Sequence, residues 1–136
     1  MHKSNLALLA FMLFVVQIAA TSAHAQGNPE RGKKAFIQCV ICHSKEPNEH
    51  KTGPSLANIW GKKAGAIESF SRYSEAIMSS GIVWDDETLD KWLRGPCSFI
   101  PGTLMNMRAI KNATERRDIV AYLKQLASQD GPKSAK

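Results

Sequence analysis

Residues 39–43 read CVICH: two cysteines separated by two residues, with a histidine directly after the second. Two sulfurs and an imidazole within one turn of chain predict that these residues bind a group or react together. Three kinds of site use them: a redox-active dithiol, part of a metal cage, and a covalently attached haem.

The rest of the chain argues against the first two. A redox-active C-x-x-C normally accompanies a βαβ pattern, and the sequence shows none. A structural zinc ion needs four Cys or His ligands. The candidates after residue 25 are Cys39, Cys42, His43, His50 and Cys97. Adjacent Cys42 and His43 are poorly placed to bind one ion together, and a second C-x-x-C is missing.

Haem attachment accounts for every position of CVICH. Two thioether bonds to the two vinyl groups need sulfurs about one turn apart, and a histidine beside the second sulfur then lies under the iron. C-x-x-C-H is the attachment signal of c-type haem. The motif therefore predicts one covalently bound haem c with its iron.

The N-terminus has the features of a signal peptide. A short basic start precedes an apolar run over residues 6–20, and AHAQ follows at 23–26. Ala23 and Ala25 fit a signal-peptidase site, so we expect residues 1–25 to be removed and the protein to reach the periplasm. Haem is joined to c-type proteins outside the cytoplasm, which agrees with export. An uncleaved anchor is the alternative, although the run is shorter than the about 20 apolar residues of a membrane span.

Residues 26–136 have the length of a single domain. Removing residues 1–25 removes one lysine and no acidic residue, so the formal charge falls from +6 to +5. The basic residues are scattered and form no block typical of a nucleic-acid tail, so we expect no nucleic-acid partner. A basic surface suits acidic partners or anionic membrane, although charge alone indicates no more than ordinary solubility.

The chain after residue 25 predicts an all-α fold with four helices. The first covers residues 28–39 and is capped by Asn28. The second covers residues 74–80. The third begins after Asp85 or Asp86 and ends at Gly95.

The fourth helix is expected over residues 114–127, with Thr114 as its N-cap. Ile119, Tyr122, Leu123 and Leu126 lie on its apolar face. We expect a flexible tail from about residue 128 to 136. Two long loops, 44–73 and 95–112, separate the helices, and loops of more than about 12–15 residues usually have a functional organiser. A large apolar prosthetic group would organise them and complete a small core.

Further motifs follow CVICH in the order GPSL at 53–56, GKKAG at 61–65, GIVWDDETLDKWL at 81–93, PGTLM at 101–105 and TERRDIVAYLKQL at 114–126. With these motifs the chain resembles the small class I cytochromes c of bacterial periplasmic and mitochondrial type, from about Gly32 to Leu126. The resemblance implies the class I cytochrome c fold, in which short helices and long loops wrap one haem. Gly32 and Tyr122 match the positions where the first and last helices cross.

The resemblance also assigns the haem ligands. Cys39 and Cys42 match the thioether residues, and His43 matches the proximal iron ligand. Met105 in PGTLM matches the distal ligand, with Met78 and Met107 as rivals.

Other positions match residues that surround the haem in the family. The Pro54 carbonyl matches the acceptor of a hydrogen bond from the proximal imidazole. Tyr73 and Trp84 match donors to a haem propionate, and Lys62 matches a basic residue near it. Thr103 matches the residue behind the distal loop.

This chain also departs from the family pattern. Trp92 stands where a tyrosine usually bonds the distal sulfur, and an indole can only donate. Met107 replaces a common phenylalanine at the haem edge, and Ile77 replaces a common asparagine. Three positions that carry docking lysines in mitochondrial-type members are Cys97, Ser98 and Leu104. We therefore expect partner binding to depend less on salt than is usual, and Cys97 is a third thiol that can form an intermolecular disulfide.

The resemblance implies an electron carrier and not an enzyme. We expect a monomer without a small-molecule substrate that shuttles single electrons from a quinol-oxidising complex to a terminal oxidase or reductase. Its partners would be membrane redox complexes or soluble reductases, contacted transiently at the haem edge. Two alternatives stay open: a ligand-binding haem protein, peroxide-reactive or gas-sensing, whose distal Met105 is displaceable, and a redox module held to one enzyme.

Overall fold

The computed structural model describes residues 26–129. The predicted signal peptide and residues 130–136 of the predicted tail lie outside the described residues. The described elements are α2 (Pro29–Ala35), the 3-10 helix η2 (Phe36–Gln38), α3 (Glu75–Ser79), α4 (Asp86–Arg94), α5 (Pro96–Phe99) and α6 (Ala113–Gln129). Extended pairing within residues 26–129 is limited to one isolated bridge between Lys63 and Val83. No helix in this part of the chain is long and apolar enough to span a membrane.

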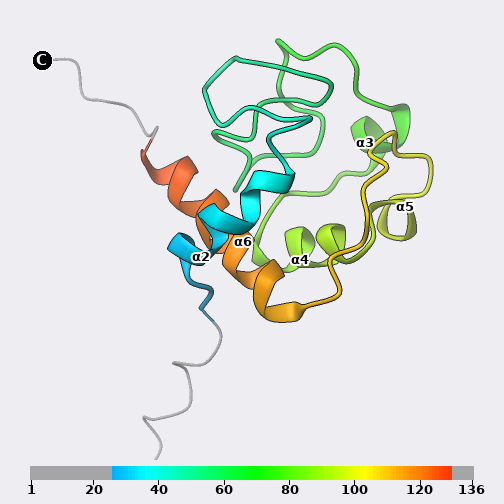
Figure 1. The fold of residues 1–136 in the computed structure, drawn as a ribbon. Helices are drawn as coiled ribbons and strands as arrows, with labels where there is room; N and C mark the ends of the chain where they lie inside the picture. The colour runs from blue at the N-terminus through cyan, green and yellow to red at the C-terminus, as the bar shows by residue number, and fades with distance from the viewer. Residues whose placement is uncertain (1–25, 130–136) are drawn as a thin grey trace, which may run out of the picture.

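The first and last helices cross at close range. Figure 1 shows α2 against α6 on one side of the molecule and α3 and α5 on the other side, with α4 between α6 and α5 and the loop that follows η2 across the top. A Cβ atom added to Gly32 would lie 1.9 Å from the Asp118 carbonyl oxygen and 2.9 Å from Tyr122 Cβ. Only glycine allows this approach. One turn further on, the rings of Phe36 and Tyr122 meet edge to face with centroids 5.2 Å apart.

A buried carboxylate fixes the same crossing. Asp118 Oδ2 accepts from Arg31 Nε at 2.7 Å, and Oδ1 accepts from Arg31 Nη2 at 2.9 Å and from the Asn28 N–H at 2.7 Å. Burial would raise the pKa of Asp118, but the hydrogen bonds from Arg31 are the larger influence and hold it below its ordinary value. The start of the domain is therefore bonded to the middle of α6.

Of the remaining helices, α4 packs on α6 and α5 packs on α4, around one hydrophobic core. Its buried members are Phe36, Ile59, Ala64, Ile77, Trp84, Leu89, Trp92, Leu93, Ile100, Ile110, Ile119, Val120, Tyr122 and Leu123. The predicted apolar face of the last helix is present: three of its four residues are in this cluster, and Leu126 packs against it. Ile77, at the position where the resemblance implies a common asparagine, is also in the core.

Several helix boundaries differ from those expected. The predicted helix over 28–39 ends at Ala35 and tightens into η2. Asp85 is the N-cap of α4, in a reciprocal capping box with Thr88. The prediction of Thr114 as N-cap of the last helix was wrong, because Asn112 Oδ1 accepts from the N–H groups of Thr114 and Glu115 at 2.9 and 3.2 Å.

Two further differences concern short segments. The four-residue helix α5 was not predicted; it begins at Pro96, directly after Gly95. The helix α6 continues to Gln129, so it includes residues 128 and 129, near the expected start of the tail. The α3 segment, capped by the Ser74 side chain, lies where a helix was expected.

The helix crossing makes a stability prediction. Gly32→Ala should lower the free energy of unfolding by about 3 kcal/mol, because the methyl group meets backbone atoms that cannot move aside. This loss exceeds the about 1 kcal/mol that alanine normally gains over glycine within a helix. Urea unfolding followed by circular dichroism measures the change. Gly95→Ala is the control, since its methyl would meet only Ser98, at 3.6 Å or more; equal stability of the two variants would contradict the prediction.

Candidate functional site

The CVICH segment continues from η2 as a single turn. The N–H groups of Cys42 and His43 both donate to the Cys39 carbonyl, at 3.1 and 2.9 Å. Cys39 is half-buried and Cys42 is exposed, and both are free thiols. Burial raises the pKa of Cys39 to about 11, with a smaller contribution from neighbouring Cys42. Two sulfurs therefore lie one turn apart, next to an imidazole.

His43 is buried and held in one orientation. Its Nδ1 lies 2.7 Å from the Pro54 carbonyl oxygen. A carbonyl only accepts, so Nδ1 carries the proton and the Nε2 lone pair is available to a metal. Burial is the main cause that lowers the pKa of His43; the bond to Pro54 opposes it, and nearby Lys51 adds to the lowering. His43 is therefore a neutral imidazole with a fixed tautomer.

Gly53 supports the ring of His43, a role that the sequence analysis missed. A Cβ atom on Gly53 would lie 2.3 Å from His43 Cε1 and 2.7 Å from Nδ1. The neighbouring Lys51 ammonium donates to the Val40 carbonyl inside the CVICH turn, and Lys51 N–H donates to the Gly53 carbonyl at 3.0 Å. The loop that carries Pro54 is thus bonded directly to the turn that carries His43. The only available sequence signal was the glycine of TGPSL.

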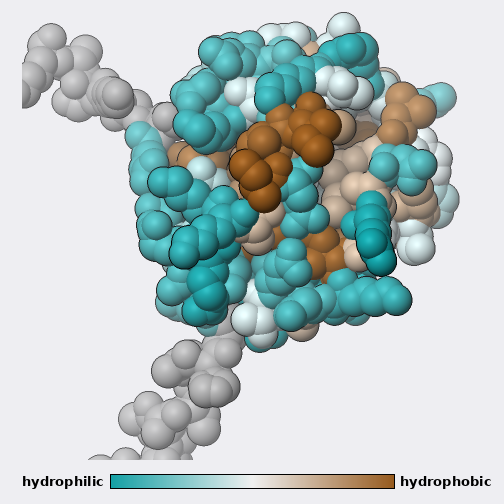
Figure 2. Space-filling model, viewed as in Figure 1, coloured by the Kyte–Doolittle hydropathy of each residue, from teal (hydrophilic) through white to brown (hydrophobic). Residues whose placement is uncertain are grey.

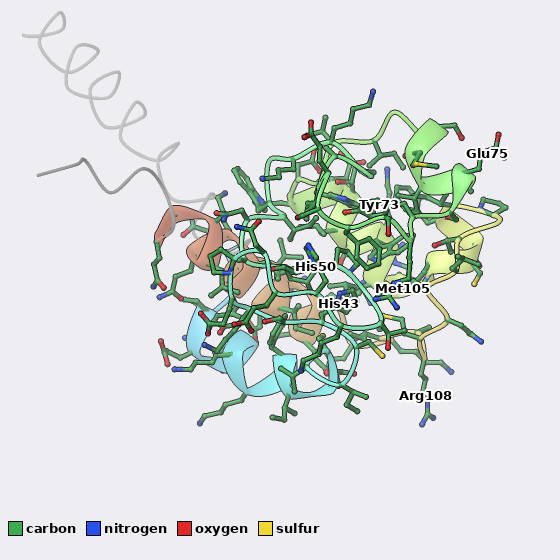
Figure 3. All side chains as sticks on the ribbon, turned by 90° about the horizontal axis from the view of Figure 1, so that it is seen from above. His43, His50, Tyr73, Glu75, Met105 and Arg108 are labelled. Atoms are coloured by element: carbon green, nitrogen blue, oxygen red, sulfur yellow. The ribbon has the colours of Figure 1, made fainter. Side chains whose placement is uncertain are left out.

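Met105 lies in the other long loop and is half-buried against the core. Its N–H donates to Thr103 Oγ1 at 3.3 Å, and the Cys97 thiol lies 3.9 Å from its carbonyl oxygen. Gly102 before it adopts φ 89°, the left-handed region that favours glycine. Figure 3 shows His43 and Met105 projecting from loops in the central part of the molecule, within the same region as Tyr73.

The rival methionines occupy different environments. Met78 in α3 is 53% exposed, whereas Met107 is partly buried and packs on the core as Met105 does. Exposure therefore disfavours Met78 as an iron ligand, and only Met107 competes with Met105 on burial.

The Tyr73 hydroxyl is buried and has no hydrogen-bond partner among residues 26–129. Burial raises the pKa of Tyr73, and the nearby Ile67 backbone offsets this only in part. The ring packs edge to face on Phe70, with centroids 4.9 Å apart. A buried donor without a partner is rare in native proteins and costs free energy. Tyr73 therefore has the property of a residue that donates to an oxygen of a bound group.

The three remaining predicted residues lie close to one another. Trp84 and Trp92 are buried with ring centroids 5.2 Å apart, and neither indole N–H bonds to a residue of the described range. Lys62 is exposed, and its backbone carbonyl accepts a hydrogen bond from the backbone N–H of Trp84 at 2.8 Å. The backbone thus brings Lys62 beside Trp84.

Large apolar side chains are exposed close to the two candidate ligands. Ile41, between the two cysteines, is 78% exposed, and Leu104, next to Met105, is 75% exposed. Ile37 in η2 is 71% exposed. In Figure 2 apolar side chains gather on the front face, over the segment that follows α2. Cys97 and Ser98 are also exposed, so the three positions that lack the family's lysines all lie on the surface.

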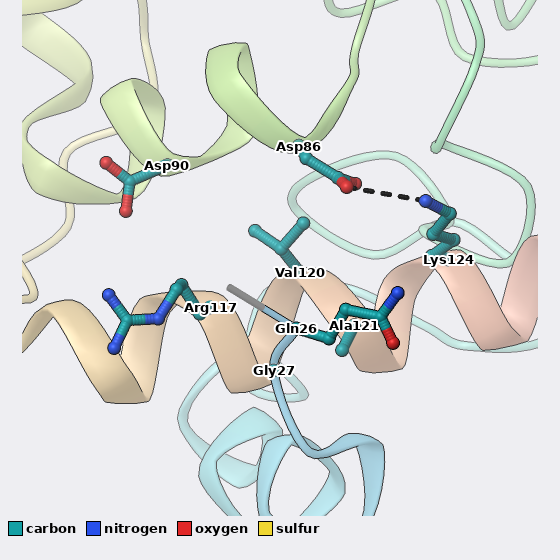
Figure 4. Close-up of a pocket in the computed structure, with 8 residues that line it drawn as sticks. All are labelled: Gln26, Gly27, Asp86, Asp90, Arg117, Val120, Ala121 and Lys124. Carbon is teal, nitrogen blue, oxygen red and sulfur yellow. Dashed lines mark hydrogen bonds and ion pairs between the residues drawn. The ribbon is translucent and has the colours of Figure 1, made fainter. Parts of the chain in front are cut away.

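The described structure also has a pocket of about 320 Å³ between α4, α6 and the start of the domain (Figure 4). It is lined by Gln26, Gly27, Asp86, Asp90, Arg117, Val120, Ala121 and Lys124. None of the predicted site residues lines it, so we assign the site to the loops around His43 and Met105.

The family model for Cytochrome c matches residues 29–127 of this chain. The chain belongs to the cytochrome c family. It is 40% identical over 121 residues to a cytochrome c2 of Rhodomicrobium vannielii, covering 88% of this chain and 94% of the relative. It is 39% identical over 126 residues to a cytochrome c2 of Blastochloris viridis, covering 92% and 97%. The solved structure of cytochrome cH from Methylobacterium extorquens is 37% identical, with a TM-score of 0.69, and covers 73% of this chain and 99% of that chain.

These similarities confirm the class I cytochrome c fold and its all-α class. They also identify the protein as an electron-carrier cytochrome and not an enzyme, with one covalently bound haem c. The residues described above fit that group. Two thiols lie in one turn, His43 presents an unprotonated Nε2, and the buried Tyr73 hydroxyl is without a protein partner. When bound, the haem iron supplies a one-electron couple between its ferrous and ferric states.

Gly53→Ala tests the support of His43. The added methyl would push the imidazole away from the Pro54 carbonyl, so we expect about 2 kcal/mol of lost stability in the haem-bearing protein. We also expect the His43 ring protons to move in the paramagnetic NMR spectrum. Thr52→Ala, at the exposed neighbouring position, is the control. Unchanged ring resonances in the Gly53 variant would rule out this role.

Tyr73→Phe tests whether the tyrosine donates to the bound haem. Loss of that bond should destabilise the haem-bearing protein by about 1 kcal/mol, measured by denaturation followed at the haem absorbance. Tyr122→Phe, at the chain's other tyrosine, is the control. If the Tyr73 hydroxyl has no partner in the haem-bearing protein, its removal will raise the stability, which is the opposite sign.

Proposed function

We propose that this protein is an exported electron shuttle whose haem iron is held between His43 and Met105. The observation that carries the proposal is the buried neutral imidazole of His43, bonded through Nδ1 to Pro54. Electrons would arrive from a quinol-oxidising complex and leave to a terminal oxidase or reductase. Cys39 and Cys42 would form the thioether bonds. Residues 1–25 would direct export as a signal peptide and be removed by cleavage after Ala25.

Met105 is the sixth ligand favoured by chemistry and position. A thioether is soft and neutral, so it suits both oxidation states, and His/Met ligation raises the reduction potential. Met105 follows a Pro-Gly turn and is half-buried, whereas Met78 is largely exposed. Two neutral ligands would keep the site nearly unchanged when an electron enters or leaves. The protein's work in this proposal is to hold both side chains in place.

Three further residues would bind the propionate side of the group. Tyr73 and Trp84 each offer a donor without a partner in the described part of the chain, and Lys62 lies beside Trp84 through its backbone. Trp92 would stand near the distal ligand, where it can only donate, and Thr103 holds the Met105 N–H. Hydrogen bonds from these donors would strengthen the binding of the haem propionates, and the side chains would exclude water from the buried edge of the haem.

Partners would meet the surface around Ile41 and Leu104. Their exposed apolar side chains favour contacts that salt screens little, and the net positive charge favours acidic partners. An electron carrier needs short-lived encounters, which small interfaces provide. We propose a monomer that contacts membrane redox complexes or soluble reductases in this way.

A second candidate is a haem protein that binds an external ligand after Met105 leaves the iron. The observation in its favour is the weak hold on Met105, whose backbone contacts have lengths of 3.3 and 3.9 Å. The near-infrared sulfur-to-iron band of the oxidised protein separates the candidates. A band that persists at neutral pH, with no carbon monoxide binding to the reduced form, supports the electron shuttle.

Met105→Ala tests the ligand assignment directly. We expect loss of the near-infrared band, a lower reduction potential in an optical redox titration, and carbon monoxide binding to the reduced form. Met107→Ala is the matched control and should keep the band. A Met105 variant that retains it, with loss in the Met107 variant, would assign the ligand to Met107 instead.

A further inference from the structure

Arg116 in the first turn of α6 is a buried cation, 4% exposed, whose contacts lie outside its own turn of helix. Its Nε donates to Asp90 Oδ1 in α4 at 2.7 Å. Its Nη1 donates to the Ile110 carbonyl at 2.7 Å and to the Lys111 carbonyl at 2.9 Å. One guanidinium therefore joins a carboxylate of α4 to the end of the loop that carries Met105.

Burial of the Arg116 guanidinium costs free energy unless its charge and its N–H groups all have partners. A buried arginine must be paired and hydrogen-bonded to offset its loss of hydration. Asp90 supplies the charge and also accepts from Arg94 Nη2 at 2.7 Å. Burial would raise the pKa of Asp90, but the hydrogen bonds from Arg116 and Arg94 outweigh it and keep the carboxylate ionised. A lysine has no planar fork with which to replace this set of bonds.

The same loop end is tied to α4 a second time, because the Ile110 N–H donates to the Leu93 carbonyl at 3.0 Å. At its other end the loop leaves α5, where the Ile100 N–H donates to the Pro96 carbonyl at 2.8 Å. Between these ends the backbone of Met105 has only the long contacts described above. The loop is held firmly at its ends and weakly in the middle.

We propose that Arg116 is a positioning residue for Met105. By fixing Ile110 and Lys111, it limits how far Met105, five residues earlier, can move away from the iron. This inference rests on the proposed ligation by Met105. In this proposal the ion pair between Asp90 and Arg116, which we call the clamp, keeps Met105 at the sixth coordination position of the iron.

The test uses the haem-bearing oxidised protein and imidazole as an external ligand that must displace Met105. In Arg116→Met we expect the apparent Kd for imidazole to fall about tenfold or more, with faster hydrogen exchange at residues 101–109. Arg116→Lys keeps a charge for Asp90 and should give an intermediate Kd. Met105→Ala sets the limit for a site with no ligand to displace.

Arg31→Gln is the matched control. This substitution breaks the bond from Arg31 to Asp118, which lies on α6 as Arg116 does. Arg31 makes no hydrogen bond to the loop that carries Met105. It should lower the unfolding midpoint without changing the Kd for imidazole. If Arg116→Met lowers the unfolding midpoint but keeps the wild-type Kd and exchange rates, Arg116 is only structural and the proposal is overturned.

Two further outcomes are distinguished by the same experiment. If Arg116→Met does not assemble, Asp90→Asn, which keeps the side-chain size, replaces it and should lower the Kd in the same direction; a wild-type Kd would overturn the clamp. A wild-type protein without the near-infrared band would contradict Met105 ligation itself, and both proposals would then be wrong. A wild-type band with an unchanged Kd in the variants contradicts the clamp alone.

Discussion

The contact between Gly32 and the backbone of α6 is the constraint on which the site depends. The α2 helix has no room for a side chain at this point, so its distance from α6 is fixed. Because α2 runs into η2 and then into the CVICH turn, the crossing also sets the positions of Cys39 and His43. The other end of the site depends on the same helix, since Arg116 reaches from α6 to the distal loop. One helix thus positions both sides of the proposed iron site.

The two sides are held by different means. On the proximal side, His43 is buried in a hydrogen-bonded turn, bonded to Pro54 and packed against Gly53, so its ring has one available position. On the distal side, the loop itself has few internal bonds and is held at its ends. With Met105 as the proposed distal ligand, the proximal ligand would stay constant and residues outside the loop would set the strength of the distal bond. Substitutions far from Met105 would then tune the site without altering its ligands.

The sequence predicted those features that local chemistry determines. The attachment motif, the apolar face of the last helix and the cap at Asn28 all depend on residues close together in the chain. The helix α5 was missed because four residues are too few for a periodic pattern. Asn112 and Thr114 are both good caps, and only the structure decides between them. Gly53 and Arg116 were missed because their roles arise from segments that meet in space. An arginine in a charged stretch is normally exposed, and its burial becomes evident only when Asp90 and the loop carbonyls are placed around it.

The exposed apolar surface gives the clamp a further consequence. Leu104 is largely exposed and directly precedes Met105, so a partner that docks on Leu104 presses on the residue beside the proposed iron ligand. Lysines at such positions would hold a partner at a distance through hydrated charges, whereas a leucine is desolvated by direct contact. A surface of this kind needs a distal loop that does not yield when it is covered. The bonds from Arg116 to Ile110 and Lys111 resist such a displacement from inside the protein, where neither salt nor the partner has access. The proposed apolar docking and the proposed clamp would therefore act together: the first would let partners contact the loop closely, and the second would keep that contact from altering the iron site.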